Sequence, residues 1–156
     1  MRWRLILPLL LLEALAILLQ PLSAEAAASA RLVKVLPHFV DKQNRVALNP
    51  SLYERDAYQA HLRKTPAEQG GMRFDVQWKS SPTNQFNLRL ELRGNKGNVG
   101  TSLVLEEKVR YSGFFSTWSK IYLTGDAYTR FGDLSAWRAT LWDGTRLVAE
   151  QKSFLW

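Results

Sequence analysis

The strongest constraint on this chain is an alternation of apolar and polar residues in two neighbouring stretches. In residues 72–79 (MRFDVQWK) and 86–93 (FNLRLELR), every second side chain is apolar. Successive side chains of a β-strand point to opposite faces, so this pattern is typical of a strand with one face in a core and the other in solvent. The two stretches therefore predict two strands of an antiparallel sheet.

Weaker runs of the same kind complete an all-β domain. They cover residues 31–36, 102–109, 118–124, 135–142 and 146–154. Loops are expected over 80–84 and 94–98, and Asp143-Gly144 favours a tight hairpin turn. Seven short strands separated by turns predict an antiparallel, immunoglobulin-like β-sandwich.

One segment is predicted to be helical instead. In NPSLYERDAYQAHLRKTP, Ser51 and Glu54 stand at the spacing of a capping box, and Pro66 blocks continuation of the helix. The segment predicts a short helix over residues 52–64, inserted between the first and second strands. A second helical turn is expected over 126–131.

The first part of the chain has the order of a secretory signal peptide. A short basic start is followed by an apolar run over residues 5–19 and then by small residues. We expect a signal peptide over 1–26 and a single β-sandwich domain over 27–156, with the protein exported to the periplasm or secreted. The alternative cleavage positions follow Ala24, Ala28 and Ala30. A retained anchor is the other interpretation, although the apolar run is shorter than the ~20 residues that span a bilayer.

Cysteine is absent, which excludes a disulfide framework, a thiolate metal site and a cysteine nucleophile. The net charge of +7 favours attraction to anionic envelope polymers. Positive and negative residues are interleaved, as in 89–93 (RLELR), which predicts ion pairs between neighbouring strands. With an export signal and no recognition motif, we expect no nucleic acid partner.

Chemistry-bearing motifs are scarce. The chain has two histidines, His38 and His61, separated by a loop and much of a helix, so a metal or acid–base site would need Asp41, Glu54 or Asp56 to join them. No motif for a nucleophilic serine or a phosphate-binding loop is present. We expect no catalytic residues, no metal, no cofactor and no enzyme activity, with a small hydrolase built on paired carboxylates as an alternative.

Aromatic residues are the more informative feature. Alternation places Trp78 and Trp137 on apolar faces, so both are predicted to lie in the core. Trp142 shares its face with Arg138, and Tyr122 also points away from its apolar neighbours. These outward residues predict a ligand platform, or rings that merely cover the sheet, or a surface that the inserted helix over 52–64 covers.

The loop over residues 111–118 adds three aromatic candidates. Phe114, Phe115 and Trp118 form either an exposed contact patch or a plug at one end of the sandwich. The predicted ligand-binding residues are therefore Trp142, Tyr122, Arg138, Phe114, Phe115 and Trp118.

The sequence ends in an apolar group, Phe154-Leu155-Trp156. We expect the last strand to close the sandwich, with Phe154 and Trp156 sealing the base of the core. The competing interpretation is the final strand of an outer-membrane barrel. Two observations argue against a barrel. Glu150 and Lys152 alternate in phase with the apolar residues and would face lipid, and the predicted number of strands is odd.

Several segments carry a resemblance to known proteins. They are VLPHF at 35–39, PSLYERDAYQA at 50–60, RFDVQWK at 73–79, AWRATLW at 136–142 and QKSFLW at 151–156. With these the chain resembles bacterial immunoglobulin-like domains, and more narrowly small exported proteins of the Verrucomicrobia whose functions are uncharacterised. The resemblance implies a fold and a compartment and brings no activity or site residues. Immunoglobulin domains pair two cysteines across their sheets, so the likeness concerns architecture alone.

Together these features predict a non-catalytic binding or accessory module of a bacterial envelope. Its expected ligand is an envelope polysaccharide bound through surface aromatics. The alternative is a structural or protein-binding module, with an envelope protein contacting the inserted helix or a free sheet edge.

Overall fold

A computed structural model describes residues 29–81, 85–110 and 115–156, so the predicted signal peptide lies outside the described residues. The strands are β1 (Ser29–Asp41), β2 (Gln69–Ser81), β3 (Gln85–Lys96), β4 (Val99–Arg110), β5 (Thr117–Thr124), β6 (Asp133–Asp143) and β7 (Arg146–Lys152). The helices are α2 (Leu52–Lys64), the short 3₁₀ helix η1 (Pro66–Glu68) and α3 (Gly125–Phe131). Among the described residues, no helix has the length and apolar character needed to cross a bilayer.

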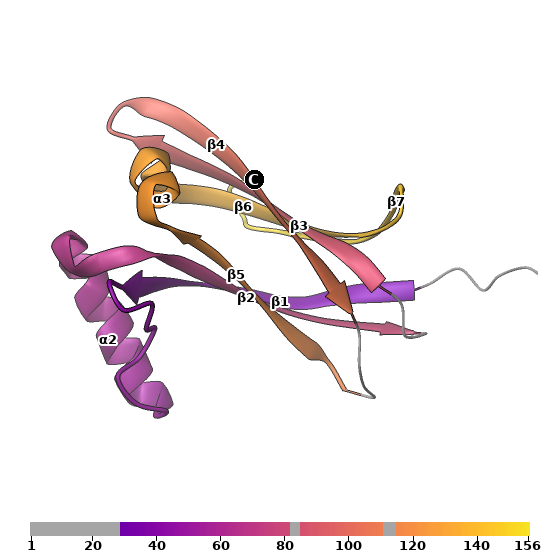
Figure 1. The fold of residues 1–156 in the computed structure, drawn as a ribbon, viewed down its shortest axis with the longest axis horizontal. Helices are drawn as coiled ribbons and strands as arrows, with labels where there is room; N and C mark the ends of the chain where they lie inside the picture. The colour runs from indigo at the N-terminus through magenta and orange to yellow at the C-terminus, as the bar shows by residue number, and fades with distance from the viewer. Residues whose placement is uncertain (1–28, 82–84, 111–114) are drawn as a thin grey trace, which may run out of the picture.

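The strands form two antiparallel sheets that pack as two layers (Figure 1). One sheet has the order β1-β2-β5 and the other the order β4-β3-β6-β7. In constant-type immunoglobulin domains the fourth strand joins the first, second and fifth, whereas here it pairs with the third. The predicted all-β, immunoglobulin-like sandwich with an inserted helix is confirmed.

The core is made by the inward-facing side chains of both sheets. Trp78 of β2 is fully buried, as predicted, and meets Phe86 of β3 edge to face with ring centroids 5.8 Å apart. The indole N–H of Trp78 donates to Ser119 Oγ at 3.0 Å, which satisfies its polar group inside the core. Trp137 is partly buried against the same core. An aromatic contact therefore joins the two sheets in a protein without disulfides.

Helix α2 has the predicted bounds and is attached to one sheet edge. The Glu54 N–H donates to Ser51 Oγ at 3.5 Å, which caps the helix as expected. Gln59, one of its two buried residues, accepts from the Phe39 N–H and donates to the Phe39 carbonyl, both at 2.8 Å. Because β1 is an edge strand, the Gln59 amide takes the place of a neighbouring strand.

Asp41 at the end of β1 fixes the connection to α2. Its carboxylate accepts from the backbone N–H groups of Gln43 and Arg45, from Arg45 Nε at 2.7 Å and from the Tyr58 hydroxyl at 2.8 Å. Burial alone would raise the pKa of this carboxyl group. The hydrogen bonds from Arg45, Tyr58 and Gln43 outweigh burial and lower its pKa to about 2.

The end of the chain differs from the prediction. Phe154 and Leu155 are exposed, and Trp156 lies on the outer face of the four-stranded sheet. The Trp156 ring is 4.0 Å from the guanidinium carbon of Arg93 and 5.1 Å from that of Arg138. The prediction that Phe154 and Trp156 seal the core is therefore wrong.

The physical reason is a turn at Ser153. Strand β7 ends at Lys152, and the Ser153 N–H donates to the Trp137 carbonyl. The Trp156 N–H then donates to the Ser153 carbonyl at 3.2 Å. Beyond this turn the side chains no longer alternate between the faces of the sheet.

Asp41→Asn is expected to weaken the fold in a pH-dependent way. The folded-state pKa of about 2 lies below the ordinary 3.8, so the charged carboxylate stabilises the fold above 3.8. That contribution is lost as the pH falls through about 2. Chemical denaturation should show a loss of about 2 kcal/mol near neutral pH that shrinks in acid. Equal stabilities of the wild type and the variant near neutral pH would contradict this role, and Glu150→Gln, an exposed carboxylate on β7, is the control.

Trp156→Ala is expected to destabilise the domain modestly without unfolding it. Loss of the contacts with Arg93 and Arg138 should lower the free energy of unfolding by about 1–2 kcal/mol. Phe154→Ala, at a fully exposed position two residues away, should leave the thermal midpoint unchanged. Unfolding of the Trp156 variant would restore the core role, and an unchanged midpoint would show that the stacking contributes nothing.

Candidate functional site

The predicted ligand-binding residues divide between the two outer faces of the sandwich. Trp142 and Arg138 lie on the outer face of the four-stranded sheet, whereas Trp118 and Tyr122 lie on the outer face of the three-stranded sheet. Phe115 lies two residues before the start of β5 at Thr117, and the predicted candidate Phe114 falls outside the described residues. The structure thus brings together the aromatics of β5 and separates them from Trp142.

On the four-stranded sheet, the polar and aromatic side chains already contact one another. Arg138 donates to both carboxylate oxygens of Glu91, at 2.8 and 2.7 Å, and lies under the Trp156 ring. The indole N–H of Trp142 donates to Thr140 Oγ1 at 2.9 Å. We call this surface the β6 face, and its members are Arg89, Glu91, Arg93, Glu106, Arg138, Thr140, Trp142 and Trp156.

Two further contacts close the β6 face. The Arg89 guanidinium carbon lies 5.6 Å from the Trp142 ring centroid, and Arg89 Nε donates to Glu106 Oε1 at 2.6 Å. The cross-strand ion pairs predicted from the interleaved charges are confirmed here and at Arg138. The rings of this face are therefore engaged by the protein's own arginines.

On the three-stranded sheet, the aromatic rings are exposed, although Tyr122 also interacts with Arg73. Trp118 is 44% exposed and Tyr122 is 43% exposed. Phe115 is 86% exposed, so Phe115 and Trp118 do not plug the end of the sandwich. We call this surface the β5 face, and its members are His38 of β1, Arg73, Asp75 and Gln77 of β2, and Trp118, Lys120 and Tyr122 of β5.

The strand register arranges the β5 face in rows across the three strands. Tyr122 pairs with Arg73, which pairs with His38. Lys120 pairs with Asp75 in the next row, and Trp118 pairs with Gln77 in the row after it. Gln77 Nε2 donates to Ser116 Oγ at 2.7 Å, and this bond holds the chain two residues before Trp118. Each exposed ring thus has a polar neighbour on β2.

A largely buried charged pair, Arg73 and Asp75, forms the floor of the β5 face. Arg73 Nη2 donates to Asp75 Oδ2 at 2.7 Å, and His38 Nε2 lies 3.6 Å from the same oxygen. Burial lowers the pKa of His38, and the positive charges of Arg55 and Arg73 lower it further against the opposing effect of Asp75. The lowered pKa of His38 favours its neutral form.

Sequence reasoning missed this floor because it depends on strand pairing. Alternation marks Arg73 and Asp75 as outward-facing, but only the pairing of β1 with β2 places His38 beside them. In the described part of the chain, Asp75 Oδ1 and Arg73 Nε have no hydrogen-bond partner, and both atoms are covered by their neighbours. These two atoms lie beneath the exposed side chains of the β5 face and are not accessible to a ligand.

The two histidines do not form a common site. His38 lies on β1, and His61 on α2 is 2.8 Å from Glu68 Oε2. Within the described ranges, no three His, Asp or Glu side chains are placed to hold a metal ion.

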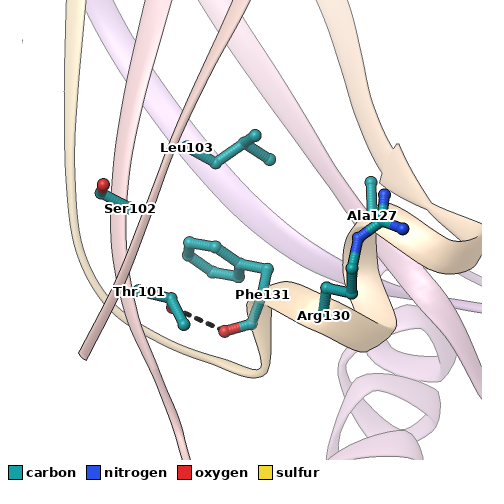
Figure 2. A pocket seen from close by; sticks show the side chains of 6 residues that line it. All are labelled: Thr101, Ser102, Leu103, Ala127, Arg130 and Phe131. Carbon is teal, nitrogen blue, oxygen red and sulfur yellow. Dashed lines mark hydrogen bonds between the residues drawn. The ribbon is translucent and has the colours of Figure 1, made fainter. Parts of the chain in front are cut away.

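A small open pocket lies between β4 and α3, at the edge of the four-stranded sheet. Its volume is about 310 Å³, and Thr101, Ser102, Leu103, Ala127, Arg130 and Phe131 line it. Figure 2 shows Thr101 and Leu103 of the strand on one side and the α3 residues on the other. Thr101 Oγ1 donates to the Phe131 carbonyl at 2.6 Å and ties the strand to the helix.

The fold and the β5 face define a cysteine-free, immunoglobulin-like β-sandwich with an open aromatic surface. No family model matches the sequence, and no curated protein matches it. A crystal structure from Akkermansia muciniphila superposes with a TM-score of 0.54 at 12% identity, covering 84% of this chain and 73% of that one. That organism is a Verrucomicrobium, the group to which the sequence resemblance points, and at this identity the match shows the fold alone.

Trp118→Ala is expected to leave the fold intact, because its ring is largely outside the core. The free energy of unfolding should change by less than about 1 kcal/mol. Trp78→Ala, the matched tryptophan on the inner face of the same sheet, should cost about 3–5 kcal/mol. Urea denaturation of both variants tests the assignment, and a collapse of the Trp118 variant would place its ring in the core.

Proposed function

We propose that this protein is an exported, non-catalytic binding module of a bacterial envelope that recognises polysaccharide through the β5 face. The observation that carries the proposal is the exposure of Trp118 and Tyr122 on one face of one strand. Exposed aromatic rings offer flat apolar surfaces on which the apolar faces of sugar rings can stack. The export signal predicted from the sequence supplies the compartment.

The spacing of the two rings suits an extended ligand. Trp118 and Tyr122 are four residues apart on β5, which corresponds to roughly 13 Å along the strand. Lys120 lies between them on the same face and is exposed. A chain of sugar residues laid along β5 would meet an aromatic ring, a cation and a second ring in turn.

The surroundings favour a polar and partly acidic ligand. Lys120 faces solvent, and the protein carries a net charge of +7. The positive charge attracts anionic polymers, and salt screens this attraction. Stacking on the aromatic rings is insensitive to salt. The two contributions can therefore be separated by ionic strength.

Tryptophan fluorescence with a panel of neutral and anionic bacterial glycans tests this function. We expect a saturable change that persists at high salt and that Trp118→Ala abolishes. Tyr122→Ala should weaken binding about tenfold or more, corresponding to loss of about 1.4 kcal/mol. Trp142→Ala is the matched control, because its indole is engaged by Thr140 on the opposite face. Binding that is lost with Trp142 and kept without Trp118 would refute the site.

A protein partner for α2 is the second candidate. Leu48 before the helix and Leu52 and Tyr53 in its first turn are all exposed, and Tyr53 is 83% exposed. Such side chains at one end of an inserted helix suit a protein contact. If α2 binds a protein partner, the tryptophan fluorescence of the folded protein should not change with any glycan. That result would favour α2 over the β5 face as the binding surface.

A further inference from the structure

The first half of strand β4 is a sheet edge without the usual protection. The strand spans twelve residues and pairs with β3 along its whole length without a register shift. Residues 99–105 (VGTSLVL) contain no charge and no proline. Natural edge strands are normally protected from pairing by charges, prolines, bulges or a covering element. In the described part of the chain, the first half of β4 has no charge, proline or bulge, and no strand pairs with its free edge.

Strand β1, an edge of the three-stranded sheet, shows what such protection looks like in this protein. Pro37 has no backbone N–H to donate, and the pairing register of β1 with β2 shifts twice. The side-chain amide of Gln59 bonds to both backbone groups of Phe39. Within one molecule, the edge of β1 is therefore blocked, whereas the first half of β4 is not.

The hairpin geometry shows which backbone groups of β4 are free. The two-residue turn Gly97-Asn98 is closed by the pair Lys96 and Val99, which is hydrogen-bonded in such hairpins. Pairs alternate from there, so every second residue directs its N–H and C=O away from β3. These residues are Gly100, Ser102, Val104, Glu106, Lys108 and Arg110. In the part of the chain that the structure describes, no other element hydrogen-bonds to their backbone groups.

We propose that a second copy of the chain pairs antiparallel with this edge, with the two-fold axis at Val104. This register pairs Val104 with the partner's Val104, and both would exchange two backbone hydrogen bonds. Val104 is 52% exposed in the single chain, and Leu103 and Leu105 are only partly buried. On the inner face, Leu103 would lie opposite the partner's Leu105, which covers both side chains.

The charges of β4 fit the same register. Glu106, Glu107 and Lys108 fall opposite the partner's Ser102, Thr101 and Gly100, so no like charges face each other. Thr101 lines the pocket together with Arg130, as Figure 2 shows. The partner's Glu107 would therefore be directed toward Arg130. Among the described residues, neither Glu107 nor Arg130 has an ion pair in the single chain.

The symmetry also sets the orientation of the two β5 faces. A two-fold axis perpendicular to the extended sheet keeps both three-stranded sheets on the same side of it. The β5 faces of the two copies then point in the same general direction. The pairing itself does not depend on what the β5 face binds.

Sedimentation equilibrium over a wide concentration series tests the pairing. The purified protein should approach twice the mass of one chain as its concentration rises. Val104→Lys places two like charges side by side at the axis and should weaken the dimer about tenfold or more. Val104→Thr, which keeps the shape and the β propensity, should remain dimeric and serves as the matched control.

Charge exchange tests the register. Glu107→Arg and Arg130→Glu should each weaken the dimer, and the double variant should restore it. If Val104→Lys breaks the dimer but the Glu107→Arg and Arg130→Glu double variant does not restore dimerisation, the proposed register is wrong. A monomer at every concentration would overturn the proposal and leave the edge to a foreign strand. A dimer insensitive to both positions would place the interface elsewhere.

Discussion

The contact between Trp78 and Phe86 joins the two sheets at the centre of a core that packing alone holds together. The two residues come from consecutive strands that belong to different sheets, so their contact fixes how the sheets face each other. In antibody domains a disulfide links the two sheets, whereas this chain has no cysteine. Packing alone must hold the layers together, which explains why the inward positions of β2 and β3 are almost all large and apolar.

Local sequence patterns predicted the elements well and the long-range arrangement poorly. The capping box and Pro66 gave α2 its bounds, because both act within a few residues. The first strand was predicted too short. A register shift between Leu32 and Lys34 lets Leu32 and Val35 both face inward at an odd spacing, which breaks the alternation.

The candidate site shows the same limit. Alternation identified Trp142 and Tyr122 as outward-facing, but it does not reveal which sheet a strand joins, so two opposite faces were merged into one platform. The final tryptophan was assigned to the core because the turn at Ser153 leaves no signal in the alternation. The structure corrects both: Trp156 and Trp142 interact with arginines on the β6 face, and the open rings belong to β5.

One outer face of the sandwich is closed by its own contacts, and we propose that the other binds a ligand. Two-dimensional NMR of the tryptophan indole N–H groups during a polysaccharide titration tests it most directly. We expect the resonance of Trp118 to shift, while those of Trp142, bonded to Thr140, and Trp78, bonded to Ser119, stay in place. A shift of the Trp142 resonance with Trp118 unchanged would contradict it.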